Sequence, residues 1–270
     1  MKRAIRNLLD ALNLGEPAHN VYKKFKYLAD SQARGRNAAF QKSAPPDMPP
    51  VPPPDIIYLV VGNFDQQSFH ESGLSLNGYI RSILQENGQD PAALGSILDF
   101  GCGCGRVVRH WADLENTSIH GSDYNPVLID WCRNNLHFAR FSINGLAPPL
   151  EYDDDSFDFI YAISVFTHLP QDLQDAWIEE MKRVLAPGGL LLVTTHGDSF
   201  LHVLSRDERT RYENAELVVA RENYPGTNLC SAHQSRNQVE QVLAKDFEYL
   251  CFKPSSNEFG QDISLLRWKG

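Results

Sequence analysis

Short apolar runs alternate with longer segments of helical periodicity through the middle of the chain. The runs have the length of buried strands rather than of helices, and they lie at residues 96–100, 118–122, 138–142, 157–163 and 190–195. Helical spacing fills the intervals at 106–114, 126–136 and 171–185. Because strands and helices alternate, the pattern predicts an α/β domain with a parallel sheet covered on both faces.

The alternation changes on the C-terminal side. Residues 144–155 contain Pro148, Pro149 and three consecutive aspartates, so we expect a loop between the third and fourth strands. A helix at 235–244 precedes two more apolar runs, 247–252 and 263–268, which predict an antiparallel hairpin at the edge of the sheet. Upstream of the first strand, the apolar run 56–61 leads to a predicted helix at 74–85.

Charge separates an N-terminal arm from the rest of the chain. Residues 1–44 carry nine Lys or Arg and three acids, whereas the remainder carries 16 and 31. Residues 1–14 place apolar side chains at helical spacing opposite basic ones, and 21–40 predict a second helix. This basic arm either makes a peripheral contact with an anionic membrane or substrate, or packs as a cap on its own acidic domain; the cap is the simpler interpretation.

A proline-rich segment, 45–55, follows the arm. Seven of the ten residues from Pro45 to Pro54 are proline, which favours an extended polyproline path and predicts a linker or a strap over the surface. The remaining residues, 56–270, are long enough for one α/β domain with a buried core. Within them, the charged stretch 196–234 exceeds a normal crossover and predicts a lid over a substrate.

Composition favours a cytoplasmic protein. No apolar run approaches the roughly 20 residues of a membrane span, and the first residues are too charged for a signal peptide. The cysteines are an odd set of five, two of them in a glycine-rich stretch, so free thiols in a reducing compartment are expected. Cys102 and Cys104 alone fall short of the four ligands of a structural zinc, and we predict no metal site.

The first strand ends in the sequence ILDFGCGCGR, in which glycines alternate at 101, 103 and 105. Glycine there lets the backbone turn and lie directly against a ligand. Asp123, after the second strand, is placed to accept hydrogen bonds from ribose hydroxyls. A dinucleotide motif would need glycine at position 106, which is Arg106, so a pyrophosphate site is not indicated.

This pattern resembles the first two motifs of the class I S-adenosylmethionine (SAM)-dependent methyltransferases. The resemblance continues through Asn144-Gly145, the fourth strand SFDFIYAISV and the turn and fifth strand APGGLLLVTTH. It implies a Rossmann-like, seven-stranded, mostly parallel methyltransferase sheet with an antiparallel C-terminal hairpin, preceded here by the helical arm. It also implies a set of SAM-binding residues: Asp99, Gly101, Cys102, Gly103, Gly105, Asp123, Tyr124, Asn144, Gly145 and Ser164. Asn144 stands where the family often has Asp, and its amide can still bind an adenine edge.

Histidines are the candidate catalytic residues. A hydroxyl acceptor loses a proton during methyl transfer, and a neutral imidazole is the side chain best suited to take it. His168 follows the fourth strand and His196 the fifth, and ligands bind at the carboxyl ends of such strands. We predict His168 as the base, then His196, with His233 as a third candidate. A helix cap or a core position is the alternative for each.

Four other side chains are expected near this site. Tyr124 covers the adenine or ribose, or else packs in the core, and Phe166 forms a wall of the acceptor pocket. Arg106 and Arg109 bind the cofactor carboxylate or an anionic substrate, or else make surface salt bridges.

The acceptor is the least defined part of the prediction. Base N-methyltransferases carry an Asp/Asn/Ser-Pro-Pro-aromatic motif after the fourth strand, where this chain reads ISVFTHL, and its acidic domain disfavours nucleic acid as a partner. The segments PPPD, FGCGCGR, SVFTHL and LAPGGLLLVTTHG, with Gln261-Asp262, resemble a bacterial methyltransferase subgroup often found beside glycosyltransferases. That resemblance implies O-methylation of a sugar or glycan intermediate. The alternatives are a small-molecule N- or O-methyltransferase of secondary metabolism and a non-catalytic SAM-binding protein.

Overall fold

The computed structural model describes residues 27, 30–46, 48–255 and 259–270. The chain divides into two compact units, residues 1–72 and 73–270, and the boundary falls inside helix α5 (Gln66–Glu86). The helix predicted at 1–14 and the first part of the one predicted at 21–40 lie outside the described residues.

The first unit contains helices α3 (Ser31–Ser43) and α4 (Pro54–Val61) and the start of α5. Asn37 joins them, because its amide donates to the Phe64 carbonyl at 2.8 Å and accepts from the Gln66 amide at 2.9 Å. The described part of residues 45–53 forms neither helix nor strand, as predicted for its prolines, and Pro54 begins α4 at a position where a missing N–H costs nothing.

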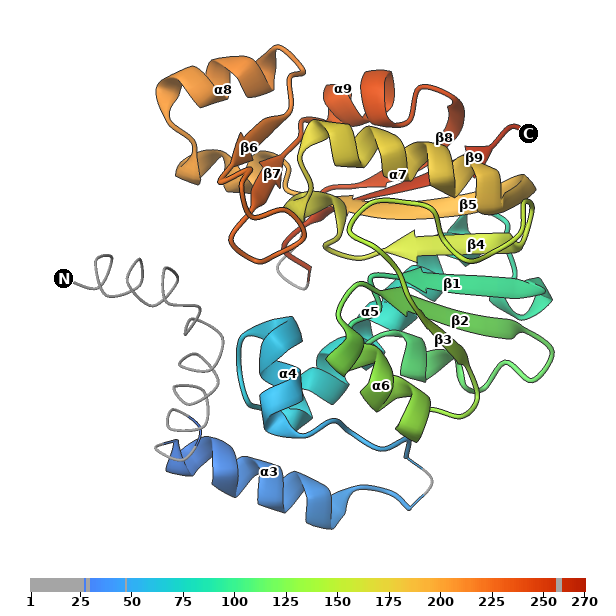
Figure 1. Ribbon diagram of the computed structural model, residues 1–270, viewed down its shortest axis with the longest axis vertical. Helices are drawn as coiled ribbons and strands as arrows, with labels where there is room; N and C mark the ends of the chain where they lie inside the picture. Colours follow the sequence, from blue (N-terminus) through green and yellow to red (C-terminus); the bar gives the residue numbers. More distant parts are fainter. Residues whose placement is uncertain (1–26, 28–29, 47, 256–258) are drawn as a thin grey trace. The chain divides into compact units, whose positions relative to one another are not determined.

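The second unit is built on a seven-stranded sheet, and Figure 1 shows its strands side by side from β8 to β3. Its strands are β1 (Ser96–Phe100), β2 (Ser118–Asp123), β3 (Arg140–Ile143), β4 (Phe157–Ala162), β5 (Leu185–Thr195), β8 (Phe247–Lys253) and β9 (Asp262–Trp268). Their order is β3-β2-β1-β4-β5-β9-β8, with β9 antiparallel to both β5 and β8 and the other pairs parallel. The predicted mixed sheet with an antiparallel C-terminal hairpin is confirmed.

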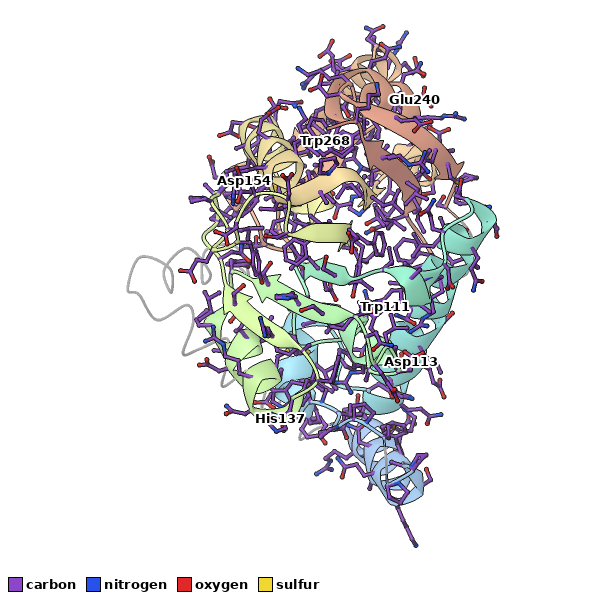
Figure 2. All side chains as sticks on the ribbon, turned by 90° about the vertical axis from the view of Figure 1, so that its right-hand side faces the viewer. Trp111, Asp113, His137, Asp154, Glu240 and Trp268 are labelled. Atoms are coloured by element: carbon purple, nitrogen blue, oxygen red, sulfur yellow. The ribbon has the colours of Figure 1, made fainter. Side chains whose placement is uncertain are left out.

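Side chains alternate between the two faces of the sheet, and each face carries its own core. On one face, Ile97 and Tyr161 pack with α5 and Trp111; on the other, Leu98 and the inner side of helix α7 (Gln171–Val184) pack with partly buried Trp268. Figure 2 labels both tryptophans. The chain runs outward from β1 to β3 and then returns to β4 beside β1. That reversal is the point where α/β sheets open a crevice for ligands.

Two predicted helices differ from the structure. Helix α6 (Pro126–Asn135) is present, but 106–114 forms only the short 3-10 turn η2 (Val108–Trp111). Gly105 has a φ of 77°, outside the helical region, and the two β-branched valines that follow it have lower helix propensity, so the segment is poorly suited to a regular helix. The helix predicted at 235–244 is α9 (Arg236–Gln238) continued by the π-turn η5 (Val239–Leu243).

An insertion lies between β5 and α9. It contains the 3-10 turn η4 (Asp198–Val203), helix α8 (Arg206–Glu213) and a two-stranded ribbon of β6 (Val218–Ala220) and β7 (Ser231–His233). Figure 1 shows it beyond the end of β5. A backbone bridge pairs His196 with His233, so the ribbon is attached to the carboxyl end of β5.

Between β3 and β4 no helix forms in residues 144–156, as the prolines and aspartates of that segment predict. None of the helices in the described part of the chain combines the length and hydropathy that crossing a bilayer requires.

Candidate functional site

The glycine-rich turn after β1 is tied to the end of β2. The amides of Gly101 and Cys102 both donate to the Ser122 carbonyl, at 2.8 and 2.9 Å. The Gly103 amide donates to Asp123 Oδ2 at 2.9 Å, so the predicted ribose acid also organises the turn. At Gly101 and Gly103 φ is 78° and 56°, in the left-handed region that glycine adopts most readily. The turn therefore presents backbone rather than side chains at the crevice.

Hydrogen-bond acceptors lie at the carboxyl ends of β1, β2 and β3. Asp99 is 3% exposed, and its Oδ2 has no donor among the described residues. Asn144 Nδ2 donates to the Gly145 carbonyl at 2.7 Å. Its buried Oδ1 likewise has no donor among the described residues. Asp123 is 8% exposed, and each of its oxygens has a backbone amide. Buried acceptors without donors indicate a ligand or water bearing N–H or O–H groups.

Burial sets the charge of the two carboxyls. It raises the pKa of Asp99 to about 7, and Asp123 adds to the shift while the Tyr161 hydroxyl and Arg106 oppose it. Burial also raises the pKa of Asp123, although two backbone amides lower it. Asp99 is therefore partly protonated near neutral pH, and a positively charged ligand would favour its ionised form.

Apolar side chains stay exposed beside these acceptors. Tyr124 is 44% exposed and Leu146 40% exposed. A Cβ placed on Gly226 would lie 2.8 Å from Leu146 Cδ1 and 3.7 Å from Tyr124 Cε1, so the chain between β6 and β7 reaches both. An exposed aromatic ring beside a buried acceptor is suited to a planar, hydrogen-bonding ligand such as a purine. The placement of Tyr124 against adenine or ribose stays a prediction.

Ser164 follows β4 with a φ of 60°, which is strained for serine. Its amide donates to Thr194 Oγ1 at 2.8 Å, and its hydroxyl donates to Gln261 Oε1 at 3.0 Å. The Thr194 hydroxyl donates to the same oxygen at 2.7 Å. The carboxyl ends of β4 and β5 are thereby tied to the start of β9. The predicted cofactor contact of Ser164 rests on its position alone, because its hydroxyl is directed at Gln261.

The three candidate bases lie together beyond the ends of β4 and β5. Ring centroids are 6.2 Å apart for His168 and His196, and 5.3 Å apart for His196 and His233. They come from three elements: the turn η3 (Phe166–His168), the residue after β5, and β7. Among the described residues, no group of three or more His, Cys, Asp and Glu side chains is arranged to hold a metal ion.

His168 has a defined tautomer. Its Nδ1 lies 2.7 Å from the Cys230 carbonyl oxygen. Because a carbonyl only accepts, Nδ1 carries the proton and Nε2 carries the lone pair. The side chain is half-buried, and this burial lowers its pKa against the opposing effect of the Cys230 contact. At neutral pH His168 is therefore an uncharged ring with a free basic nitrogen.

His196 is a weaker base. It is 8% exposed, and burial together with His233 and His168 lowers its pKa to about 3. Its ring lies 4.0 Å from the Phe200 ring, and its Nε2 lies 3.4 Å from Gln261 Nε2. A base whose pKa is this far below the working pH has little drive to take a proton. The low pKa of His196 thus favours His168 over His196 for that role.

Residues 97–189, which run from β1 into β5, match a family model described as a methyltransferase domain. This part of the chain is a methyltransferase domain of the class I, SAM-dependent kind. The predicted resemblance to that family is confirmed by this match. The association with glycosyltransferases has no support from it.

Curated relatives of this methyltransferase differ in what their names say they modify. It is 35% identical over 144 residues to probable tRNA methyltransferase 9B of Homo sapiens, covering 52% of this chain and 27% of that one. It is 29% identical over 178 residues to malonyl-[acyl-carrier protein] O-methyltransferase of Paenibacillus sp. strain JDR-2, covering 61% and 59%. The chain spans only 24% to 59% of the length of such relatives.

A solved structure supports the fold of the methyltransferase. The PH0226 protein of Pyrococcus horikoshii OT3 matches with a TM-score of 0.55 and 17% identity, over 78% of this chain and 95% of that one. At that level of identity the likeness establishes the fold alone.

SAM, the methyl donor of this family, fits the acceptors of the crevice. Its ammonium, ribose hydroxyls and adenine amine are all donors. The methyltransferase offers three acceptors at successive strand ends, Asp99, Asp123 and Asn144, and two of them have an oxygen without a donor among the described residues. The match between three donors and three acceptors is what makes these residues suited to SAM.

Gly101 is expected to be intolerant of a side chain. A Cβ there would lie 2.3 Å from Val165 Cγ2, and φ is 78°. We expect Gly101→Ala to lower the free energy of unfolding by about 2–4 kcal/mol, from the left-handed backbone and the overpacking together. Gly188→Ala is the matched control, because φ is also 78° but nothing lies within 4 Å, and about 1 kcal/mol is expected. Equal losses in urea unfolding would contradict the steric argument.

One expected contact is wrong, and another residue lies in the interior. Phe166 is fully buried in the same core cluster as Trp177, so it forms no wall of a pocket. Arg109 is 1% exposed, donates from Nε to the Gly105 carbonyl at 2.9 Å and lies 5.6 Å from the Trp131 ring. It therefore supports the glycine turn through the Gly105 carbonyl. The positive charge of Arg106 acts on Asp99 and lowers its pKa. Arg106 remains a candidate partner for the cofactor carboxylate.

Cys102 contributes through its backbone and its volume. Its Sγ would lie 3.0 Å from a Cβ on Gly121 of β2, so the loop packs tightly on that strand. Burial raises the pKa of the Cys102 thiol well above its usual value, which makes it unreactive.

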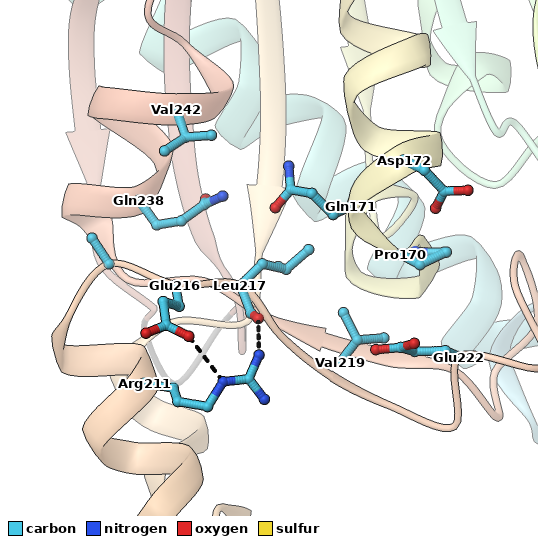
Figure 3. A pocket seen from close by; sticks show the side chains of 11 residues that line it. Pro170, Gln171, Asp172, Arg211, Glu216, Leu217, Val219, Glu222, Gln238 and Val242 are labelled. Carbon is cyan, nitrogen blue, oxygen red and sulfur yellow. Dashed lines mark hydrogen bonds and ion pairs between the residues drawn. The ribbon is translucent and has the colours of Figure 1, made fainter.

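A cavity of about 510 Å³ lies outside this site, among the start of α7, the α8–β6 segment and η5. Figure 3 shows apolar Leu217 and Val242 with the ion pair of Arg211 and Glu216 around it. Gln238, which is buried, also lines it. None of the three histidines or the strand-end acceptors lines it, so this cavity is not the cofactor site.

The sequence did not indicate the roles of Thr194, Ser231 and Gln261. Ser231 Oγ lies 3.0 Å from His233 Nε2 and 3.4 Å from His196 Nδ1. Gln261 was distinguished only as part of a late Gln-Asp pair, and nothing in its neighbourhood along the chain marks it as a neighbour of β4 and β5.

Proposed function

We propose that this methyltransferase transfers the methyl group of SAM to a hydroxyl oxygen of a sugar or glycan intermediate, with His168 as the general base. We choose oxygen as the methyl acceptor because of the contact between His168 Nδ1 and the Cys230 carbonyl, at 2.7 Å. It fixes the ring so that Nε2 is free to take a proton. An acceptor that has no proton to lose would not need this arrangement.

Bound SAM supplies a methyl group on a positively charged sulfur, which leaves as a neutral thioether. As the new C–O bond forms, His168 Nε2 takes the proton of the acceptor hydroxyl. Asp123, Asp99 and Asn144 hold the donor through its ribose, ammonium and adenine, and the glycine turn brings the backbone close to it. The chain's main contribution is alignment of donor and acceptor, since the methyl group is already activated.

The proposed lid is the insertion 196–234. The Gly226 amide donates to the His168 carbonyl at 2.8 Å, and Cys230 accepts from the His168 ring, so one loop of the insertion surrounds the base. The same loop reaches Tyr124 through Gly226. A segment in contact with both the cofactor side and the base is suited to exclude water during transfer.

Polar and aromatic groups around the histidines support a sugar acceptor. Ser231, His233 and Gln261 supply hydrogen-bonding groups, and Phe200 supplies a ring beside His196. A sugar presents hydroxyls at its edge and C–H groups on its faces, which such a surface complements. The malonyl-[acyl-carrier protein] relative, by its name an O-methyltransferase, is consistent with an oxygen acceptor.

The pH dependence of SAM binding tests the role of Asp99. Its pKa in the free protein is about 7, raised mainly by burial, and the ammonium of SAM favours the ionised carboxylate. Below about pH 7 binding must displace a proton, so affinity is expected to fall by up to about tenfold per pH unit and to level off above pH 7. Calorimetry from pH 5.5 to 8.5 measures this. In Asp99→Asn the slope should disappear, and a slope that persists would exclude Asp99 as its source.

Incubation with SAM and candidate sugars, nucleotide sugars and lipid-linked glycans, followed by mass spectrometry, tests the function. A gain of about 14 daltons on a sugar acceptor is the expected result. Methylation confined to other small metabolites would replace the glycan proposal with the secondary-metabolism alternative. Tight SAM binding with no methylated product from any extract would favour a non-catalytic protein.

A further inference from the structure

Gln261 lies where three strand ends meet. Its Oε1 accepts from the Ser164 hydroxyl at 3.0 Å and from the Thr194 hydroxyl at 2.7 Å. The Thr194 oxygen already accepts the Ser164 amide at 2.8 Å, which leaves its proton for Gln261. Both hydroxyls donate to this oxygen, because an amide oxygen can only accept. The Nε2 end therefore points the other way.

The Nε2 of Gln261 faces His196 Nε2 at 3.4 Å. An amide nitrogen only donates, so the facing ring nitrogen must carry its lone pair, and the ring proton must lie on Nδ1. His196 Nδ1 is 3.4 Å from Ser231 Oγ, which is itself 3.0 Å from His233 Nε2. The hydrogen bonds thus run in one direction, from Gln261 through His196 and Ser231 to His233.

We propose that Gln261 is a positioning residue that holds His196 as a neutral ring with its Nε2 lone pair occupied, leaving His168 to take the proton of the acceptor. This inference rests on the proposed methyl transfer. His196 is otherwise the competing base, because its ring lies only 6.2 Å from that of His168. An occupied lone pair removes the competition without removing the ring.

The groups packed around His196 agree with a neutral ring. Two histidines, His168 and His233, face it from η3 and β7, and a charge on either would repel a second charge. The carboxylates near it are engaged elsewhere: Asp198 accepts the Tyr212 hydroxyl at 2.8 Å, and Asp262 accepts the Ser255 amide at 2.7 Å. Glu208 faces His233 and favours the charged form of that ring instead. Burial, His233 and His168 lower the pKa of His196 to about 3, although its hydrogen bond with the backbone of Ala232 acts in the opposite direction.

Nitrogen-15 NMR of the histidine rings in the full chain tests the proposal without any acceptor. In the unaltered protein we expect His196 to show the Nδ1–H tautomer and no titration between pH 5 and 8. Gln261→Met removes the donor and should shift His196 toward the Nε2–H tautomer. Gln261→Glu places a carboxylate at Nε2 and should raise the pKa of His196 by about 1–3 units.

An Nε2–H tautomer of His196 in the unaltered protein, or unchanged His196 resonances in both variants, would overturn the proposal. Thr194→Val is a second route if a Gln261 variant misfolds, because loss of one hydroxyl loosens the amide and should move the His196 tautomer in the same direction. The outcome is separable from the proposed function. Failure to methylate sugars leaves the NMR result intact, and a wrong tautomer leaves the effect of His168→Ala on turnover intact.

Discussion

Replacing Asp123 with alanine is expected to weaken the binding of S-adenosylhomocysteine by about 100-fold or more, equivalent to about 3 kcal/mol. The variant loses the proposed carboxylate acceptors of two ribose hydroxyls, and hydrogen bonds to a charged group are among the strongest in a site. It also loses the contact of Asp123 with the Gly103 amide at 2.9 Å, so the glycine turn is less well ordered for the ligand. Isothermal titration calorimetry measures the change.

Asp130→Ala is the matched control for Asp123→Ala. Asp130 lies on helix α6, shortly after Asp123, and its side chain is 65% exposed in a weak ion pair with Arg133. We expect its loss to leave the affinity unchanged. Circular dichroism of both variants establishes that each is folded. Folded Asp123→Ala protein that binds S-adenosylhomocysteine as tightly as the Asp130→Ala protein would contradict the assignment of the ribose acid.

His168→Ala is expected to lower kcat by about 100- to 10,000-fold once an acceptor is known, because general-base catalysis contributes about that much. Affinity for SAM should not change, since His168 lies on the acceptor side. The dependence of kcat on pH should also change. Burial lowers the pKa of His168 below 6.5, so the basic form dominates at neutral pH and activity falls as pH drops through that pKa. This acid limb should be absent from the variant.

His202→Ala is the control for His168→Ala. His202 is an exposed histidine of the same insertion, with its Nδ1 2.8 Å from the Ser199 carbonyl. Its loss should leave kcat and the acid limb unchanged. If His168→Ala retains more than about a tenth of the activity with the limb in place, the base is another group.

Apolar runs predicted every strand of the sheet, most clearly the central strands, whose residues are largely buried. In β1 four of five residues are buried, and β5 and β9 are buried along most of their length. The edge strand β3 was placed two residues early, at 138 instead of Arg140, since only β2 pairs with it. The prediction of a helix at 106–114 was wrong. The periodicity of apolar residues contains no information about the φ angle of Gly105 or about the hydrogen bond from the Arg109 side chain to the Gly105 carbonyl.

The residues proposed for the cofactor side follow strand ends along the sequence, whereas the contacts on the proposed acceptor side join distant parts of the chain. Glycines, the ribose acid and the polar residue after β3 follow strand ends in sequence order, so topology alone gathers them. The histidines could be named for the same reason. The contacts that distinguish one histidine from another could not be predicted from the sequence. Gln261 contacts Ser164, which is 97 residues away along the chain, and His196, which is 65 residues away. Phe166 was misplaced because a residue after a strand can turn into the core as readily as toward a ligand.

Calorimetric titration of the folded protein with S-adenosylhomocysteine tests the central claim most directly, because every role assigned to a residue depends on this ligand occupying the crevice at the ends of β1 and β2. Saturable binding at one site per chain is expected, with an affinity that Asp123→Ala lowers by about 100-fold or more. The absence of heat on correctly folded protein would contradict this claim.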